Sequence, residues 1–199
     1  MNDLFKRYSF YQLIILGFNV VRTKFVFKSA RIIRFPFDVR GKKFILMSKG
    51  FTTGVGCRLE AYPTNKNKVL FIGDNLQIND YVHITAMENV SIGNNVLMAS
   101  KIYISDCSHG SYSGDDNDSS PNVNPIDRPL FSSPVFIKDN VWLGESVSVL
   151  PGVTIGQGTI VGANSVVTKD LPDFVIAVGI PAKPIKKFNF QSQKWEKYL

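Results

Sequence analysis

Residues 135–171 read VFIKDN, VWLGES, VSVLPG, VTIGQG, TIVGAN, SVVTKD and L, a series that repeats every six positions. One position of each unit is aliphatic, and the position two residues earlier forms a second row of small or aliphatic side chains. Two shorter series keep the same period over 72–84 and 92–104, with a step of eight residues between them. The in-phase residues are Ile72, Ile78, Ile84, Ile92, Met98, Ile104, Ile137, Leu143, Val149, Ile155, Val161 and Val167. Because hydrophobic residues make up only 44% of the chain, chance does not explain this row.

A period of six fits neither an α-helix, in which six residues make roughly 1.67 turns, nor simple strand alternation. It fits a short strand followed by a corner, three of which close one coil, and stacked coils bury a continuous aliphatic ladder between parallel strands. A sandwich of six-residue strands is the alternative, but it needs longer turns and a less regular phase. Glycine and asparagine at the expected corners, such as Gly73, Asn75 and Asn164, adopt positive φ at low cost.

Composition excludes several classes of protein. A chain of 199 residues with 20% charged residues is typical of one globular domain and not of a disordered protein. Two cysteines, Cys57 and Cys107, exclude a disulfide scaffold and a four-cysteine zinc site. Two histidines, His83 and His109, exclude a zinc site that needs three histidines from one chain. The sequence therefore predicts no metal site.

The positive charge is concentrated at the N-terminus. The formal net charge is +7, yet the first fifty residues hold eleven Lys or Arg and only two Asp. This asymmetry indicates an anionic partner, and no nucleic-acid-binding module is recognisable. The apolar stretch 8–21 is too short to span a bilayer and lacks the cleavage site of a secretory signal. It predicts either a helix packed on the main body or a basic amphipathic segment on an anionic membrane, in a protein expected to be cytoplasmic.

The units of the form [LIV]-G-x4 resemble those of the hexapeptide-repeat acyltransferases. The resemblance covers about residues 45–187 and implies an all-β fold, a left-handed parallel β-helix. It also implies a homotrimer with each active site between two subunits. Residues 1–44 are expected to form a basic and apolar helical segment that packs on the β-helix. Residues 188–199 are expected to form a C-terminal tail or short helix.

The polar segment 105–134 interrupts the period and predicts a functional loop rather than a disordered insertion. Its SDCSHG motif, with SYSG at 111–114 and Arg-Pro-Leu at 128–130, resembles that of polysaccharide O-acetyltransferases. The resemblance implies that His109 is the general base, since a neutral imidazole accepts the proton of an attacking sugar hydroxyl. In that subfamily a further histidine often stands two positions earlier, where this chain has Cys107. Asp106 is expected either to orient His109 or to stabilise a turn, and Tyr112, Leu130 and Phe131 to anchor the loop.

The resemblance also assigns the remaining site residues. A backbone N–H near Gly144 and Glu145 is expected to stabilise the oxyanion. Acetyl-coenzyme A is the expected co-substrate, with lysines contacting its phosphates. Its expected ligands are Trp142, Ala163, Thr168, Lys169, Gly179, Pro181, Lys183 and Lys186. The acceptor side is expected to include Asn79, Tyr81 and His83. Direct transfer in a ternary complex needs no covalent intermediate, so Cys107 is not expected to be a nucleophile.

These expectations favour an acetyl-coenzyme A-dependent O-acetyltransferase that acts on a sugar hydroxyl of a surface polysaccharide, such as an O-antigen or capsule, or of its precursor. One alternative is N-acetylation of a nucleotide-linked amino sugar. A different class, a non-catalytic β-helix scaffold, is disfavoured by the pairing of His109 with the lysine-rich donor motif. A peripheral contact with the inner face of the membrane through the basic N-terminal segment stays open.

Overall fold

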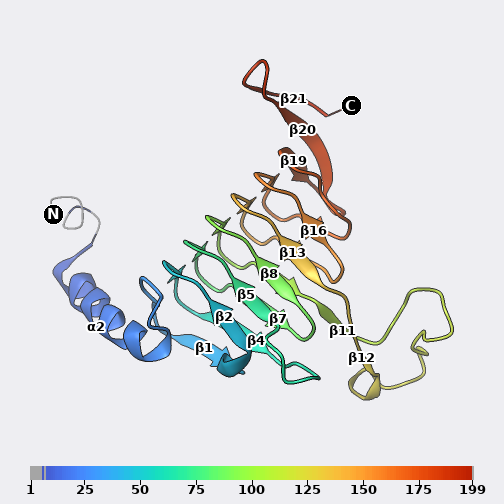
Figure 1. Ribbon diagram of the computed structural model, residues 1–199, viewed down its shortest axis with the longest axis horizontal. Coiled ribbons are helices and arrows are strands. Elements are labelled where there is room, and N and C mark those ends of the chain that lie inside the picture. The colour runs from blue at the N-terminus through green and yellow to red at the C-terminus, as the bar shows by residue number, and fades with distance from the viewer. Residues whose placement is uncertain (1–5, 7, 199) are drawn as a thin grey trace.

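The protein is a three-sided parallel β-helix with an N-terminal helix, a projecting loop and a C-terminal hairpin (Figure 1). The computed structural model describes residue 6 and residues 8–198; residues 1–5 and 7 of the expected N-terminal segment, and residue 199, lie outside the described residues. The 17-residue helix α2 (Phe10–Val26) begins with a capping box in which Ser9 and Gln12 exchange hydrogen bonds. No helix among the described residues is long and apolar enough to cross a membrane.

Each coil places one short strand in each of three sheets. The first sheet contains β1 (Phe37–Arg40), β4 (Cys57–Ala61), β7 (His83–Ala86), β10 (Tyr103–Ser105), β15 (Ser148–Val149) and β18 (Val166–Val167). The second contains β2 (Ile45–Met47), β5 (Leu70–Ile72), β8 (Val90–Ile92), β13 (Val135–Ile137) and β16 (Thr154–Ile155). The third contains β3 (Thr52–Thr53), β6 (Gln77–Ile78), β9 (Leu97–Met98), β14 (Trp142–Leu143), β17 (Ile160–Val161) and β19 (Val175–Val178).

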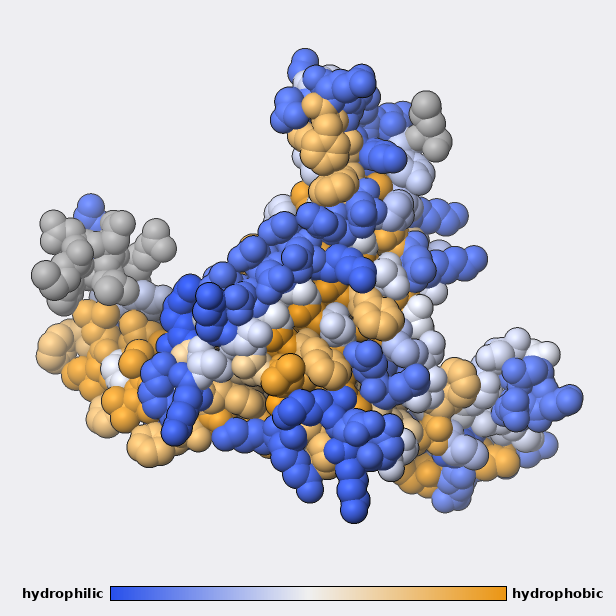
Figure 2. Space-filling view, in the orientation of Figure 1, coloured by the Kyte–Doolittle hydropathy of each residue, from blue (hydrophilic) through white to orange (hydrophobic). Residues whose placement is uncertain are grey.

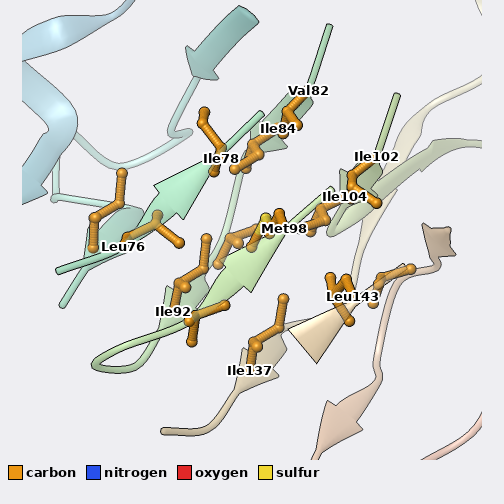
Figure 3. Packing of buried hydrophobic residues seen from close by; sticks show 14 of the residues in the cluster. Leu76, Ile78, Val82, Ile84, Ile92, Met98, Ile102, Ile104, Ile137 and Leu143 are labelled. Atoms are coloured by element: carbon orange, nitrogen blue, oxygen red, sulfur yellow. The ribbon is translucent and has the colours of Figure 1, made fainter. Parts of the chain in front are cut away.

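The six-residue period is confirmed by the strand register. Ile84 pairs with Ile104, Ile104 with Val149, and Val149 with Val167, all in parallel. These side chains point into the coil, and in-phase residues from all three sheets meet at its centre (Figure 3). Every in-phase residue named above is at most 2% exposed. The aliphatic ladder is therefore the core of the molecule.

The β-helix begins before residue 45, contrary to the boundary predicted from the sequence. β1 pairs in parallel with β4, from Phe37 opposite Cys57 to Arg40 opposite Glu60. Ile32 forms a further parallel bridge to Thr52. The six-residue repeat does not extend into this first coil, so the start of the β-helix cannot be recognised from the repeat. A short 3-10 turn, η1 (Lys42–Phe44), leads from β1 to β2.

The C-terminal segment is a β-hairpin, so the predicted tail or helix is wrong. β20 (Lys183–Asn189) runs antiparallel to β19, and β21 (Lys194–Lys197) runs antiparallel to β20. Aromatic side chains hold it together: the rings of Phe188 and Trp195 are 5.3 Å apart, and Phe190 lies 4.9 Å from Phe174 of the last coil. Residues 183–187 thus belong to the hairpin rather than to the β-helix.

The buried ladder predicts a large difference between two neighbouring residues of β9. Met98 is fully buried, whereas Leu97 points outward and is 38% exposed. We expect Met98→Ala to lower the free energy of unfolding by about 2–5 kcal/mol, because it leaves a cavity in the ladder. The matched control, Leu97→Ala, should cost less than about 1 kcal/mol. Chemical denaturation measures both, and equal losses would contradict the ladder as the main stabilising element.

Candidate functional site

The loop 105–134 leaves the β-helix where the first sheet ends and presents His109 to solvent. β11 (Cys107–His109) and β12 (Leu130–Ser132) form an antiparallel pair at its base, with His109 opposite Leu130. The Tyr112 hydroxyl donates to the His109 carbonyl at 2.6 Å, and Arg128 Nη1 donates to that hydroxyl at 2.7 Å. The backbone of His109 is therefore fixed while its ring stays exposed.

The loop is ordered by hydrogen bonds rather than by buried anchors. Tyr112, Leu130 and Phe131 were expected to anchor it, but they are 59%, 51% and 43% exposed. Instead, Arg128 Nε donates to the Val123 carbonyl at 3.1 Å, and the 3-10 turn η2 (Pro125–Asp127) precedes it. Aromatic side chains that remain exposed beside a fixed histidine are available to contact another molecule.

Asp106 does not orient His109. Its carboxylate is fully buried and accepts the backbone N–H groups of Met87, Glu88 and Asn89 at 2.8 Å each. These three residues make the corner at which two residues are inserted between Ile84 and Ile92. Of the two roles considered for Asp106, the structure therefore shows that it stabilises a turn.

His83 lies on the outer face of the first sheet in a network centred on Glu60. Because the Arg58 guanidinium only donates, the contact of 3.1 Å makes His83 Nδ1 an acceptor. Nε2 then carries the proton and donates to Glu60 Oε2 at 2.8 Å. Both ring nitrogens are occupied, so His83 is not placed to act as a base. Thr85 and Arg40 also bind Glu60, at 3.1 and 2.8 Å.

The three expected acceptor-side residues border two separate hollows. His83 and the 60%-exposed Tyr81 line one of about 400 Å³, together with Phe37 and Arg58. Asn79 lines another, of about 370 Å³, near the corner where the third sheet turns into the first. Tyr81 and His83 thus line the same hollow, whereas Asn79 lines the neighbouring one.

The corner between β14 and β15 holds the two expected oxyanion donors, and one of them is already hydrogen-bonded. The Gly144 N–H donates to the Val161 carbonyl at 2.8 Å, so it is already used between the coils and is not the oxyanion donor expected. Gly144 is required for another reason, since a Cβ there would lie 2.6 Å from the Ala163 nitrogen. At the equivalent place of the first coil, the Val55 N–H donates to Asp80 Oδ1.

The residue stacked against Glu145 is Ala163, which has no side-chain acceptor. Within the described part of the chain, no group accepts a hydrogen bond from the Glu145 N–H. Glu145 and Ala163 are both exposed. The backbone N–H of Glu145 is thus free to bind a developing oxyanion, as the second of the two predicted donors.

Some of the expected acetyl-coenzyme A ligands lie on or next to the third sheet. One register row runs from Trp142 through Ile160 and Ile176 to Lys186, which places an exposed indole and a lysine on the same face. The Ala182 N–H donates to the Val166 carbonyl at 2.8 Å, which places Lys183 beside the last coil. Thr168 and Lys169 follow β18, at the opposite end of that strand from Ala163. Gly179, at φ +105°, and the cis peptide bond before Pro181 shape the turn into β20.

His109 and Glu145 lie at opposite ends of the strands of the first sheet. The loop with His109 leaves where the first sheet turns toward the second, whereas Glu145 precedes β15 at the entry to the first sheet. One chain therefore does not bring His109 and the Glu145 N–H together.

Cys107 is not an activated thiol. Burial raises the pKa of the Cys107 thiol above its usual range, and the charge of Asp106 acts in the same direction, while a hydrogen bond with Ser105 only partly offsets them. A thiol is a poor nucleophile compared with a thiolate. This agrees with the expectation that Cys107 forms no covalent intermediate.

Comparison with known proteins places this fold and site in context. Residues 134–169 match the family model described as "Bacterial transferase hexapeptide (six repeats)". The chain is 47% identical over 194 residues to the "Putative lipopolysaccharide biosynthesis O-acetyl transferase WbbJ" of Escherichia coli K12, covering 98% of this chain and 97% of that protein. A galactoside acetyltransferase solved in complex with coenzyme A is 32% identical, covers 71% of this chain and 68% of its own, and has a TM-score of 0.52.

The N-acyltransferase AntD of Bacillus cereus shares the fold over a longer range. A mutant of AntD with one serine replaced by alanine, solved with dTDP-4-amino-4,6-dideoxyglucose and coenzyme A, is 22% identical and has a TM-score of 0.68. The match covers 93% of this chain and 92% of that one. The fold of these proteins is the left-handed parallel β-helix that the repeat and its resemblance predicted.

Sequence reasoning missed the groups that hold the site in place. Arg128 and Tyr112 were noted only as parts of a motif and an anchor, yet together they fix the backbone of His109. Glu60 and Arg58 lie in the irregular first coils and meet His83 only after the strands stack. No local pattern signals such a contact between residues more than twenty positions apart.

Removal of the Asp106 carboxylate should destabilise the protein. We expect Asp106→Ala to cost about 3 kcal/mol or more, because three buried or half-buried N–H groups lose a charged acceptor. Asp118→Ala is the matched control, since Asp118 also accepts a backbone N–H, that of Gly114 at 3.0 Å, but in the exposed loop. Denaturant titration of both variants tests this, and a control loss as large as that of Asp106→Ala would contradict it.

The Glu60 network predicts a pH-dependent contribution to stability. Burial would raise the pKa of the Glu60 carboxyl, but hydrogen bonds from His83 and Thr85 and the charge of Arg58 outweigh it and lower the pKa. A lowered pKa in the folded state stabilises the protein above the unfolded-state pKa, and this contribution is lost as the pH falls through the folded-state pKa. We expect Glu60→Gln to lower the free energy of unfolding by about 1–3 kcal/mol at pH 7.

The difference between wild type and Glu60→Gln should shrink as the pH falls below about 4, because the unfolded carboxyl is protonated first and the folded carboxyl follows at lower pH. Thermal unfolding of both proteins across this range measures it. A difference that stays constant with pH would show that the ionised carboxylate is not what stabilises the network.

Proposed function

Because the chain belongs to the hexapeptide-repeat acetyltransferases, we propose that it transfers an acetyl group from acetyl-coenzyme A to a sugar hydroxyl of a surface polysaccharide or its precursor. The observation that carries the proposal is the 47% identity, over nearly the whole length of both chains, to a relative named for O-acetyl transfer in lipopolysaccharide biosynthesis. The exposed His109 ring on a fixed backbone supports it, since this is what a general base for a bulky acceptor requires.

In the proposed reaction the sugar hydroxyl attacks the thioester carbonyl while the His109 imidazole accepts its proton. The oxyanion of the tetrahedral intermediate is stabilised by the backbone N–H of Glu145. Collapse of the intermediate breaks the carbon–sulfur bond, and the imidazolium returns its proton to the departing coenzyme A thiolate. The products are the acetyl ester and free coenzyme A, so no covalent enzyme intermediate is needed.

The donor groove is proposed along the third sheet and the turn that follows it. Trp142 offers an exposed apolar face for the coenzyme, while Lys183 and Lys186 offer charge to its phosphates. The roles of Thr168 and Lys169 rest on the resemblance, as do those of Asn79, Tyr81 and His83 on the acceptor side. We place the reaction in the cytoplasm.

We propose that the active site is completed by a second copy of the chain in a homotrimer. The separation of His109 and Glu145 to opposite ends of the first sheet supports this, because a neighbouring subunit can bring the two together. The exposed loop around Tyr112 and Arg128 extends away from its own β-helix, as a contact with a neighbour requires (Figure 1).

The activity is tested by coenzyme A release from acetyl-coenzyme A, with mono- and oligosaccharides as acceptors. We expect His109→Ala to lower turnover by roughly two to four orders of magnitude, because the attacking hydroxyl loses its base. Asp118→Ala, in the same exposed loop, is the control and should retain activity. Release with amino sugars alone would favour N-acetylation, and absence of coenzyme binding would leave a non-catalytic scaffold.

The shared site is tested by subunit complementation. His109→Ala is co-expressed with a donor-groove variant, Trp142→Ala/Lys183→Ala/Lys186→Ala, and assayed at limiting acetyl-coenzyme A. If base and groove come from different chains, random mixed trimers regain about a quarter of wild-type activity, although each variant alone is inactive. No recovery in purified mixed trimers would show that each site is built from one chain.

A further inference from the structure

The helix α2 exposes a continuous apolar stripe. Phe10, Ile14, Phe18, Val21 and Phe25 follow one another at intervals of three or four residues and are 79%, 45%, 66%, 60% and 82% exposed. At 3.6 residues per turn, these positions fall on one face roughly 100° wide. Figure 2 shows apolar side chains covering this arm of the molecule. Part of the face is a shallow apolar hollow that includes Leu13 and Gly17.

The side of α2 that contacts the β-helix holds two buried polar residues, beside the half-buried Leu16 and Val26. Asn19 and Thr23 are its two buried residues. The Thr23 hydroxyl donates to the Asn19 carbonyl at 2.6 Å and accepts from the Ile33 N–H at 2.7 Å. A helix of a soluble domain normally does the reverse, burying its apolar stripe and exposing its polar side. The orientation of α2 is therefore fixed by hydrogen bonds that aim its apolar side chains outward.

The segment of chain that carries the stripe has only cationic charges. Residues 4–37 contain seven Lys or Arg and no Asp or Glu. Arg22 and Lys24 border the stripe; the Arg22 guanidinium lies 3.7 Å from the centroid of the Phe35 ring, and Lys24 Nζ donates to the Ala30 carbonyl at 2.9 Å. Lys6 and Lys28 are exposed near the two ends of the helix. An apolar stripe flanked by cations and free of anions matches an anionic lipid surface in both respects.

We infer that α2 docks the protein on an anionic bilayer, lying parallel to its plane with Phe10, Phe18 and Phe25 inserted among the lipids. The aromatic and aliphatic side chains lose contact with water, and the surrounding lysines and arginines meet the lipid phosphates. A second copy of the chain is a poorer occupant of this face, because two such surfaces would bring like charges together without any acidic partner from residues 4–37. This inference does not depend on the proposed reaction.

The test is flotation of the purified full chain with vesicles of phosphatidylcholine, with and without phosphatidylglycerol. We expect binding to the anionic vesicles to exceed binding to the neutral ones by about tenfold or more and to fall as salt is added. The variant Phe10→Ser/Phe18→Ser/Phe25→Ser should lose about tenfold in binding, since three exposed rings no longer insert. Ile126→Ser is the matched control, because Ile126 is 72% exposed but lies in the loop far along the chain from α2.

Three outcomes would overturn the inference. Wild-type protein that does not float with anionic vesicles rules out docking. Binding that survives the triple substitution, or falls equally in Ile126→Ser, shows that α2 does not carry it. Light scattering of the same proteins without lipid gives the third: a smaller oligomer in the triple variant than in wild type would identify a second copy as the occupant. The substituted rings are exposed, so the variant is expected to fold, and circular dichroism checks this.

Discussion

The stacking of inward-pointing aliphatic residues is the constraint on which the rest of the structure depends. A two- or three-residue strand has almost no stability alone, but in the middle coils each one pairs in parallel with strands of the coils before and after it. The side chains between them form one core cluster from Phe27 to Ala177, part of which Figure 3 shows. Because the register of every strand is set by this ladder, the outward-facing side chains are also held at fixed positions.

A rigid tube of this kind leaves its functional groups on its outside. Corners differ in length and in what accepts their N–H groups, and at several corners the accepting side chain comes from the next coil. Asp106 and Asp80 close two such corners, whereas Ala163 leaves the Glu145 N–H open. The loop with His109 starts at another corner. His109 and the Glu145 N–H are therefore separated by the length of the strands of one sheet. In the proposed trimer, a second subunit brings the two groups together.

The N-terminal helix differs from the β-helix in which of its residues are buried. The β-helix buries its inward aliphatic residues, but the buried residues of α2 are Asn19 and Thr23, and its phenylalanines are exposed to solvent. The hydrophobic effect favours removing this stripe from water, and no part of the described chain covers it. Its fixed orientation relative to the tube would determine which side of the enzyme faces a surface on which it docks.

The repeat determined that this protein is a stack of three-sided coils, because a six-residue period in the buried positions is compatible with few other architectures, while the left-handedness of the coils was implied by the resemblance to the hexapeptide-repeat family. The repeat also marked the polar interruption at 105–134, and the resemblance of its SDCSHG motif singled out His109 within it. The start of the first coil was not predictable, because Phe37–Arg40 pairs with β4 without keeping the repeat. The C-terminal hairpin was not predicted either, since its stability comes from aromatic packing between Phe174 and Phe190, which are sixteen residues apart.

Only the tertiary structure decided the roles of single polar residues. Asp106 could have faced His109, but stacking of the coils places its carboxylate against three backbone N–H groups. Both nitrogens of His83 are occupied because Arg58 and Glu60 come from the neighbouring strand. Gly144 and Glu145 were indistinguishable as donors until the register showed which N–H already belongs to the ladder. Hydrogen-bond partners are set by the register between coils, which a periodic sequence encodes but does not display.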